Sequence, residues 1–151
     1  MSKFKDPVII WIAMEKIKRT AEEFNDCTSR IIGCAMKIHS TLGNGFREVI
    51  YQRALEIELK LEGLEFIREL EMPIFYRDKK IGSRRVDFFV EREIMVELKA
   101  VIHLEDVHLA QAINYLEAYN MKTGLLINFG SRSLTFKRLF NKKYLLNKNS
   151  V

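Results

Sequence analysis

The sequence predicts a mixed α/β, or α+β, layered fold in a single domain, and three observations lead to this prediction. Apolar residues recur at helical spacing in three segments, residues 28–42, 47–62 and 104–119. Runs rich in apolar, β-branched and aromatic residues form strand-like segments, residues 66–77, 81–90, 94–101 and 123–129. The length of 151 residues fits one domain that buries a core without disulfides.

The first two helices are bounded by capping residues and glycines. The first is expected to start near Thr28, with Thr28 or Asp26 as its N-cap, and to end at the glycines of residues 43–45. The second is expected over residues 47–62, since Gly63 follows it. The two helices therefore form a pair that precedes all the strands.

The N-terminal residues 1–25 have a less regular pattern. We expect them to form an extension or an additional helix, so that residues 26–151 make up the domain itself. The apolar run at residues 7–14 is too short for a membrane span, which needs ~20 residues, and no small-residue cleavage site follows it. We expect a cytoplasmic protein with no membrane association. Cys27 and Cys34 are expected to be reduced, packed thiols.

The strands are expected to begin with an antiparallel meander. Residues 66–77 form the first strand, and Pro73 places this strand at an edge or a bulge. A turn at residues 78–80 leads to the strand at 81–90, and a second short loop leads to the strand at 94–101. The meander therefore follows the helix pair directly.

A helix and one or two further strands complete the domain. The helix at residues 104–119 precedes an apolar strand at 123–129, as expected for a buried strand next to a crossover helix. Residues 134–140 are expected to form a fifth strand or the start of a last helix. The predicted order is α-α-β-β-β-α-β-β, which defines a layered α/β arrangement.

The composition is mildly basic, with a net charge of +5 and a pI of about 9.2. Basic residues concentrate towards both ends of the chain: Lys16, Lys18, Arg19, Lys137, Arg138, Lys142, Lys143 and Lys148. This charge is compatible with a polyanionic partner and equally with an ordinary solvated surface.

Charged residues interrupt the most strand-like part of the sequence. If residues 91–93 form a three-residue hairpin loop, Val90 pairs with Ile94, and Asp87 lies opposite Glu97. Directly opposed residues point to the same face with Cβ atoms ~5 Å apart. Lys99 is two residues beyond Glu97 and shares that face.

This cluster has two interpretations. Two carboxylates at that spacing repel each other unless a proton or a cation lies between them, and oxygen ligands of this kind suit Mg²⁺ or Mn²⁺. A neighbouring lysine then orients or deprotonates a water, or stabilises charge on a phosphate. The alternative is a structural salt bridge between Lys99 and the acids.

Three sequence motifs, one of which contains the cluster, resemble those of a known protein family. Asp87, nine intervening residues and then Glu-Leu-Lys at 97–99 resemble the signature of the PD-(D/E)xK nuclease superfamily. The segment GFREVIY, residues 45–51, fits a GxxExxY pattern, and QAINY, residues 111–115, fits the QxxxY pattern of the RecB-like branch. Over residues 28–140 the chain resembles the small bacterial and archaeal GxxExxY proteins, which implies a restriction-endonuclease-like αβββαβ core.

The resemblance implies roles for particular residues. Asp87, Glu97 and the carbonyl of Leu98 would bind Mg²⁺ or Mn²⁺, and Glu48 would bind the metal directly or through water. Glu48 is alternatively a helix-start acid that the macrodipole favours. Lys99 would position or activate the attacking water.

The helix at 104–119 contributes polar residues to the same candidate site. Gln111 and Tyr115 lie at i and i+4, so they share a face and would contact Lys99, the phosphate or the nucleic-acid backbone; alternatively they are a polar flank of a surface helix. His108 is a candidate cleft residue, whereas His39 is expected to pack or to cap carbonyls.

We therefore expect a metal-dependent nuclease that hydrolyses phosphodiester bonds, with DNA favoured over RNA. The alternative is a non-catalytic nuclease-fold module that binds nucleic acid or assembles a complex. A homodimer or a protein partner would supply sequence specificity, because a chain of 151 residues leaves little room for a recognition domain.

Overall fold

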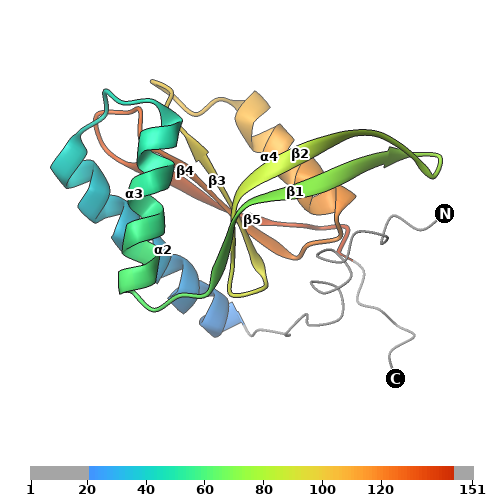
Figure 1. The fold of residues 1–151 in the computed structure, drawn as a ribbon, viewed down its shortest axis with the longest axis horizontal. Helices are drawn as coiled ribbons and strands as arrows, with labels where there is room; N and C mark the ends of the chain where they lie inside the picture. The colour runs from blue at the N-terminus through green and yellow to red at the C-terminus, as the bar shows by residue number, and fades with distance from the viewer. Residues whose placement is uncertain (1–20, 145–151) are drawn as a thin grey trace.

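The computed structural model describes residues 21–144, and within them three helices accompany a five-stranded mixed sheet (Figure 1). The helices are α2 (Ala21–Leu42), α3 (Glu48–Leu61) and α4 (Asp106–Ala118). The strands are β1 (Phe66–Tyr76), β2 (Lys79–Val90), β3 (Ile94–Lys99), β4 (Thr123–Asn128) and β5 (Thr135–Phe140). The predicted order of elements is confirmed, and residues 134–140 supply a strand rather than a helix. The prediction for residues 1–25 lies mostly outside the described part.

The sheet has the order β1-β2-β3-β4-β5. The first three strands form the predicted antiparallel meander, and β5 also runs antiparallel to β4. Strands β3 and β4 are parallel, because α4 crosses over between them. This central parallel pair brings the carboxyl ends of β3 and β4 to the same edge of the sheet.

Helices cover both faces of the sheet (Figure 1). Alternate residues of β3 point to opposite faces, so Ile94, Val96 and Leu98 pack beneath α2 and α3. Met95 points the other way and packs with the apolar side of α4. Strand β3 is therefore buried on both faces, so Glu97 sits in the interior, and only Lys99 at the end of the strand is half-buried.

Helix α2 begins earlier than predicted. Glu22 and Glu23 lie in its first turn, where the helix dipole favours acids, and Phe24 extends its apolar stripe. Thr28 is thus inside the helix, and its hydroxyl donates to the Phe24 carbonyl at 3.0 Å. The prediction that Thr28 or Asp26 caps the helix is wrong, because this local hydrogen bond satisfies the threonine within the helix.

The connection from α2 to α3 is held by a buried tyrosine. Gly43 adopts a φ of 74° just after α2 and donates its N–H to the His39 carbonyl, as expected of a glycine that ends a helix. The Tyr51 hydroxyl donates to the Gly43 carbonyl at 2.6 Å and accepts from the Phe46 N–H at 3.1 Å. Tyr51 thereby fixes the loop that leads to the first residue of α3, Glu48.

Strands β1 and β2 extend well beyond the sheet as a two-stranded hairpin (Figure 1). Its turn is Arg77–Asp78, both at positive φ, and Tyr76 pairs directly with Lys79. The turn predicted at residues 78–80 is therefore one residue early in the structure, because two residues suffice for a hairpin of this type. Pro73 lies in the edge strand, as predicted, next to a register shift.

Two further expectations can be checked among residues 21–144. Cys27 and Cys34 are buried and form no disulfide, as predicted. None of the helices in this described range is long and apolar enough to cross a membrane.

Candidate active site

The site begins where β2 and β3 separate. The loop at residues 91–93 pairs Val90 with Ile94, as predicted, and the pairing continues to Phe88 and Val96, where it stops. One step further, where no strand pairing remains, the carboxyl groups of Asp87 and Glu97 lie close enough for each to act on the pKa of the other. Here a side chain replaces the backbone partner, since the Leu98 N–H donates to Asp87 Oδ2 at 2.8 Å. We call this point, formed by Asp87, Glu97 and Leu98, the fork.

A hydrogen-bonded chain from α3 and β1 fixes the Asp87 carboxylate. Gln52 Nε2 donates to Asp87 Oδ1 at 2.9 Å, and Gln52 Oε1 accepts from Arg68 Nη2 at 2.9 Å. Arg68 in turn pairs with Glu56 at 2.8 Å. An arginine can only donate, so the amide oxygen of Gln52 must face Arg68 and its NH₂ must face Asp87. Both oxygens of Asp87 are therefore held by donors.

Glu97 is the most deeply buried acid of the fork. Its side chain is 4% exposed, and its Oε2 accepts from Arg84 Nη2 at 3.0 Å. Its Oε1 is buried and has no hydrogen-bond partner. Burial, and then the neighbouring Asp87 carboxylate, raise the pKa of Glu97 to about 8, although Arg84 and Lys99 oppose the shift. At neutral pH this carboxyl holds a proton unless a cation replaces it.

Burial also raises the pKa of Asp87, despite the hydrogen bonds from Leu98 and Gln52 that favour its ionised form. Two raised pKa values at one point mean that the fork holds more acid than its surroundings neutralise. The carboxyl oxygens of Asp87 and Glu97 can therefore still bind a proton or a cation.

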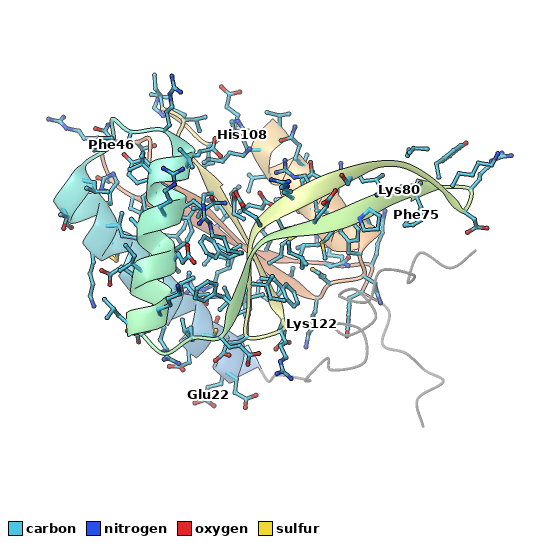
Figure 2. All side chains as sticks on the ribbon, viewed as in Figure 1. Glu22, Phe46, Phe75, Lys80, His108 and Lys122 are labelled. Atoms are coloured by element: carbon cyan, nitrogen blue, oxygen red, sulfur yellow. The ribbon has the colours of Figure 1, made fainter. Side chains whose placement is uncertain are left out.

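Glu48 approaches the fork from the start of α3. Much of its side chain is exposed, but partial burial of the carboxyl group raises its pKa. Lys99 and Asp87 act on it most strongly after burial, and the charges of Arg84 and His108 also act on it. His108 lies at the start of α4, at the same end of the molecule as the loop before α3 (Figure 2). Its Nδ1 accepts from the Glu105 N–H at 2.9 Å, which fixes the ring.

Lys99 lies at the end of β3, half-buried, opposite Asn128 of β4. Its charge opposes the rise in the pKa of both Glu97 and Glu48, so it lies near both carboxyl groups. Within residues 21–144 it forms no ion pair. The cation that pairs with Glu97 is Arg84, so the alternative interpretation, a salt bridge of Lys99 with the acids, is not what the structure contains.

The two polar residues predicted on α4 have different surroundings. The Tyr115 ring lies under the Arg84 guanidinium, 4.6 Å from its centroid, and so supports the cation that pairs with Glu97. Gln111, one turn earlier, is exposed and has no hydrogen-bond partner within the described range. The structure thus brings Tyr115 to the fork through Arg84 and leaves Gln111 on the surface beside it.

Asn128 holds the end of β3 in place. It is fully buried, its Oδ1 accepts from the Val101 and Gly130 N–H groups, and its Nδ2 donates to Val101 O and Ser131 Oγ. His39 adds a contact from α2, with Nε2 3.0 Å from the Ser131 carbonyl, in agreement with a packing role. This clamp fixes the segment that directly follows Lys99.

Sequence reasoning missed three of these residues: Gln52, Arg84 and Asn128. Gln52 had a usable signal, because it is four residues after Glu48 and therefore on the same helix face. Asn128 was hidden inside an otherwise apolar strand, where a lone amide is itself a sign of a buried hydrogen-bonding role. Arg84 had no local signal, since its contact with Glu97 depends on how the strands diverge.

The donor set of the fork fits a hard divalent cation. It combines two carboxyl groups, one buried oxygen without a donor and a nearby backbone carbonyl, and oxygen ligands are those that Mg²⁺ and Mn²⁺ prefer. Among residues 21–144, however, no three histidine, cysteine, aspartate or glutamate side chains already converge to hold a metal. Two side-chain carboxylates would therefore be the first ligands of a cation there, and other groups would complete its coordination.

Comparison with known proteins gives a family match for most of the chain. In a comparison with protein families, residues 25–139 match the PD-(D/E)XK nuclease superfamily. Neither the search of curated proteins nor the search of solved structures gave a match. The matched region contains the fork, all three described helices apart from the start of α2, and nearly the whole sheet. The chain therefore belongs to the PD-(D/E)XK nuclease superfamily, and its α+β architecture is consistent with the restriction-endonuclease-like fold.

Proposed function

We propose that this protein is a metal-dependent nuclease of the RecB-like branch, of the GxxExxY type, which hydrolyses phosphodiester bonds in DNA. The observation that carries the proposal is the fork. Two neighbouring acids with raised pKa values, the buried Glu97 and the partly buried Asp87, meet there where the strands separate, and a lysine lies two residues beyond Glu97. Superfamily membership supports a nucleic-acid substrate and a divalent metal.

Asp87, Glu97, the Leu98 carbonyl and Glu48 are the ligands that we assign to Mg²⁺ or Mn²⁺. In an extended strand the N–H and C=O of one residue point to the same side. Because the Leu98 N–H points towards Asp87, its carbonyl also faces the gap that β2 leaves open. Glu48 reaches the same region from α3, which supports a direct or water-mediated contact.

The bound cation would supply a water of lowered pKa and would stabilise charge on the phosphate. The protein's own residues do the rest. Gln52 and the Leu98 N–H keep Asp87 in one orientation. Lys99 orients the attacking water in line with the leaving oxygen, and Arg84, once its partner Glu97 turns to the cation, is placed to neutralise a phosphate oxygen. Tyr115 stacks on Arg84, and Gln111 extends the same helix face towards the nucleic-acid backbone.

A cleavage assay tests this proposal. Wild type and Glu97→Gln are incubated with duplex DNA, single-stranded DNA and RNA in Mg²⁺ or Mn²⁺, with EDTA as the blank. We expect metal-dependent cleavage of DNA by wild type and only background in Glu97→Gln, which keeps the size of the side chain. Equal cleavage by both proteins would remove the fork from the mechanism.

A second candidate function is a non-catalytic module that binds nucleic acid or assembles a complex. It is favoured by the fact that Arg84, Gln52 and the Leu98 N–H already provide partners for both acids. This candidate predicts DNA binding in EDTA that Mg²⁺ neither strengthens nor converts into cleavage. A homodimer or another protein would then carry the specificity.

A further inference from the structure

The proposed chemistry takes only Arg84 from the hairpin that extends beyond the sheet, and leaves the rest of this hairpin without a role. We call residues 73–85 the arm. Strand β2 pairs with β3 only from Phe88 onwards, so within residues 21–144 the arm is a two-stranded ribbon held by the pairing of β1 with β2 alone. Its far half is open to solvent, and Tyr76 and Ile81 are 63% and 66% exposed (Figure 1). A ribbon that projects in this way needs an explanation beyond the core.

The charge of the arm is strongly one-sided. It contains five cations and one acid, Asp78, and a second acid, Glu71, lies opposite Arg85 just outside it, in a chain whose total charge is +5. The cations gather in two places: Arg77, Lys79 and Lys80 around the turn, and Arg84 and Arg85 near the fork. Figure 2 shows Lys80 beside its cross-strand partner Phe75 towards the tip. Arg84 already pairs with Glu97, so the cations that remain for an acidic partner lie mainly around the turn.

We propose that the arm enters the major groove of duplex DNA and thereby holds a strand's phosphates beside the fork. This inference rests on the proposed action on DNA. The major groove of B-DNA, about 12 Å wide and 8.5 Å deep, accepts a two-stranded β-ribbon. At ~3.3 Å per residue, the strand from Pro73 to Tyr76 reaches roughly 10 Å, which matches this depth.

Strand β2 runs from the turn of the arm to the acids of the fork. Arg84 and Arg85 lie at its base, and Asp87 follows two residues later on the same strand. A duplex that is gripped at the turn thus runs back along β2 to the carboxylates. Tyr76 and Ile81 offer apolar contacts of the kind made with thymine methyl groups.

Two other uses of the arm fit less well. Charges on a projecting edge strand also prevent aggregation, but either sign serves that purpose, and here one sign dominates. A second copy of the chain would place two arms of like charge against each other, which electrostatics opposes. Duplex RNA has a deep and narrow major groove that admits no such ribbon, so the inference separates DNA from RNA.

The test compares two variants that lose the same charge. Arg77→Gln/Lys79→Gln/Lys80→Gln removes the cations at the turn, and Lys37→Gln/Arg53→Gln/Lys122→Gln removes three exposed cations elsewhere. Lys122 precedes β4 and so lies at the end of the sheet opposite the fork (Figure 2). Binding to one sequence, as duplex DNA and as duplex RNA, is measured by fluorescence anisotropy in EDTA over a range of salt.

We expect wild type to prefer duplex DNA over duplex RNA. The slope of log K against log salt should fall by about one for each phosphate that the protein no longer neutralises, and so by up to about three in the arm variant. The matched control should keep the wild-type slope. Circular dichroism and Mn²⁺ binding check that each variant is folded with its fork intact.

Several results would overturn the inference: no DNA binding by wild type, an unchanged slope in the arm variant, an equal loss in the control, or equal affinity for duplex RNA. Because the assay contains no metal, it does not depend on cleavage. If DNA binds through the arm but is never cleaved, only the proposed nuclease activity is refuted. If DNA is cleaved but the salt slope of the arm variant is unchanged, only the proposed role of the arm is refuted.

Discussion

The two ends of the β2–β3 pair follow different physical rules. Next to the loop, Phe88, Val90, Ile94 and Val96 are fully buried, apolar and joined by backbone pairing. At the other end the backbone pairing stops, and side chains of Asp87, Gln52 and Arg84 take over the hydrogen bonding. One residue step along β2 and β3 therefore separates the apolar core from the polar site.

The comparison shows which end stabilises the fold and which end opposes it. Burial of the apolar end contributes favourably, at roughly 25 cal/mol per Å². Burial of the two acids does the reverse, and this cost is what raises the pKa of Asp87 and Glu97. A chain that keeps a costly arrangement in its interior has another use for it, and the fork supplies one.

The largest expected effect comes from Lys99→Met, which removes the ammonium at the polar end and keeps its aliphatic length. Turnover should fall by about 10²–10⁴-fold, the range for loss of a group that moves or orients a proton. Affinity for Mn²⁺ should change far less, because Lys99 is not an oxygen ligand. Single-turnover kinetics with calorimetry check both, and a wild-type rate would exclude Lys99 from the reaction.

Next is Gln52→Leu, which removes the donor to Asp87 and leaves Arg68 with one partner fewer. Loss of an outer partner of a metal ligand costs about 10–100-fold in metal affinity or activity. A titration of Mn²⁺ against wild type and variant measures this. Unchanged affinity and rate would mean that the Leu98 N–H alone fixes the carboxylate.

At the apolar end, Val96→Ala should affect stability rather than chemistry. Removal of two buried methyl groups costs roughly 1–3 kcal/mol once the remaining cavity is included. Urea denaturation measures the loss, and turnover at a temperature where both proteins are folded should stay close to wild type. A large fall in turnover with unchanged stability would contradict the division between the two ends.

The last expected effect is a pH dependence of stability in the metal-free protein. Glu97 has a pKa of about 8 when folded against a reference of 4.5, so between these values the folded state holds a proton that the unfolded state releases. Its contribution is therefore fully present below about pH 4.5 and is lost as pH rises towards 8. The raised pKa values of Asp87 and Glu48 act in the same direction.

Thermal unfolding in EDTA from pH 5 to pH 8 tests this, with Glu97→Gln as the reference that cannot titrate. Wild type should lose more Tm than the variant across this range, by about 2–4 °C for each kcal/mol. Parallel Tm curves for the two proteins would show that Glu97 is not perturbed as described.

Much of this arrangement could be predicted from local sequence. Period and turn signals predicted every helix and strand of residues 26–140, and the loop at 91–93 was enough to align Val90 with Ile94. The strand pairing ends before Asp87 and Glu97, but the two carboxyl groups still lie close enough for each to act on the pKa of the other. The predicted cap at Thr28 failed because the helical stripe continues towards the N-terminus through Phe24. Local signals do not show where a helix with acids in its first turn begins.

The rest of the site depends on contacts between distant segments. The pairing of Arg84 with Glu97 and Tyr115 joins two strands and a helix, and Asn128 acts on the loop after another strand. No spacing rule along one element predicts such contacts. The same reason explains why the alternative interpretation, a salt bridge of Lys99 with the acids, did not foresee that a cation from β2, Arg84, pairs with Glu97.

The central claim is that the acids of the fork form a metal site, and calorimetry of Mn²⁺ binding tests it most directly. Wild type is compared with Asp87→Asn/Glu97→Gln, alone and with a short DNA duplex that can supply phosphate oxygens. The account predicts binding by wild type that the double variant loses. No binding by folded wild type with or without the duplex, or equal binding by the variant, would contradict it.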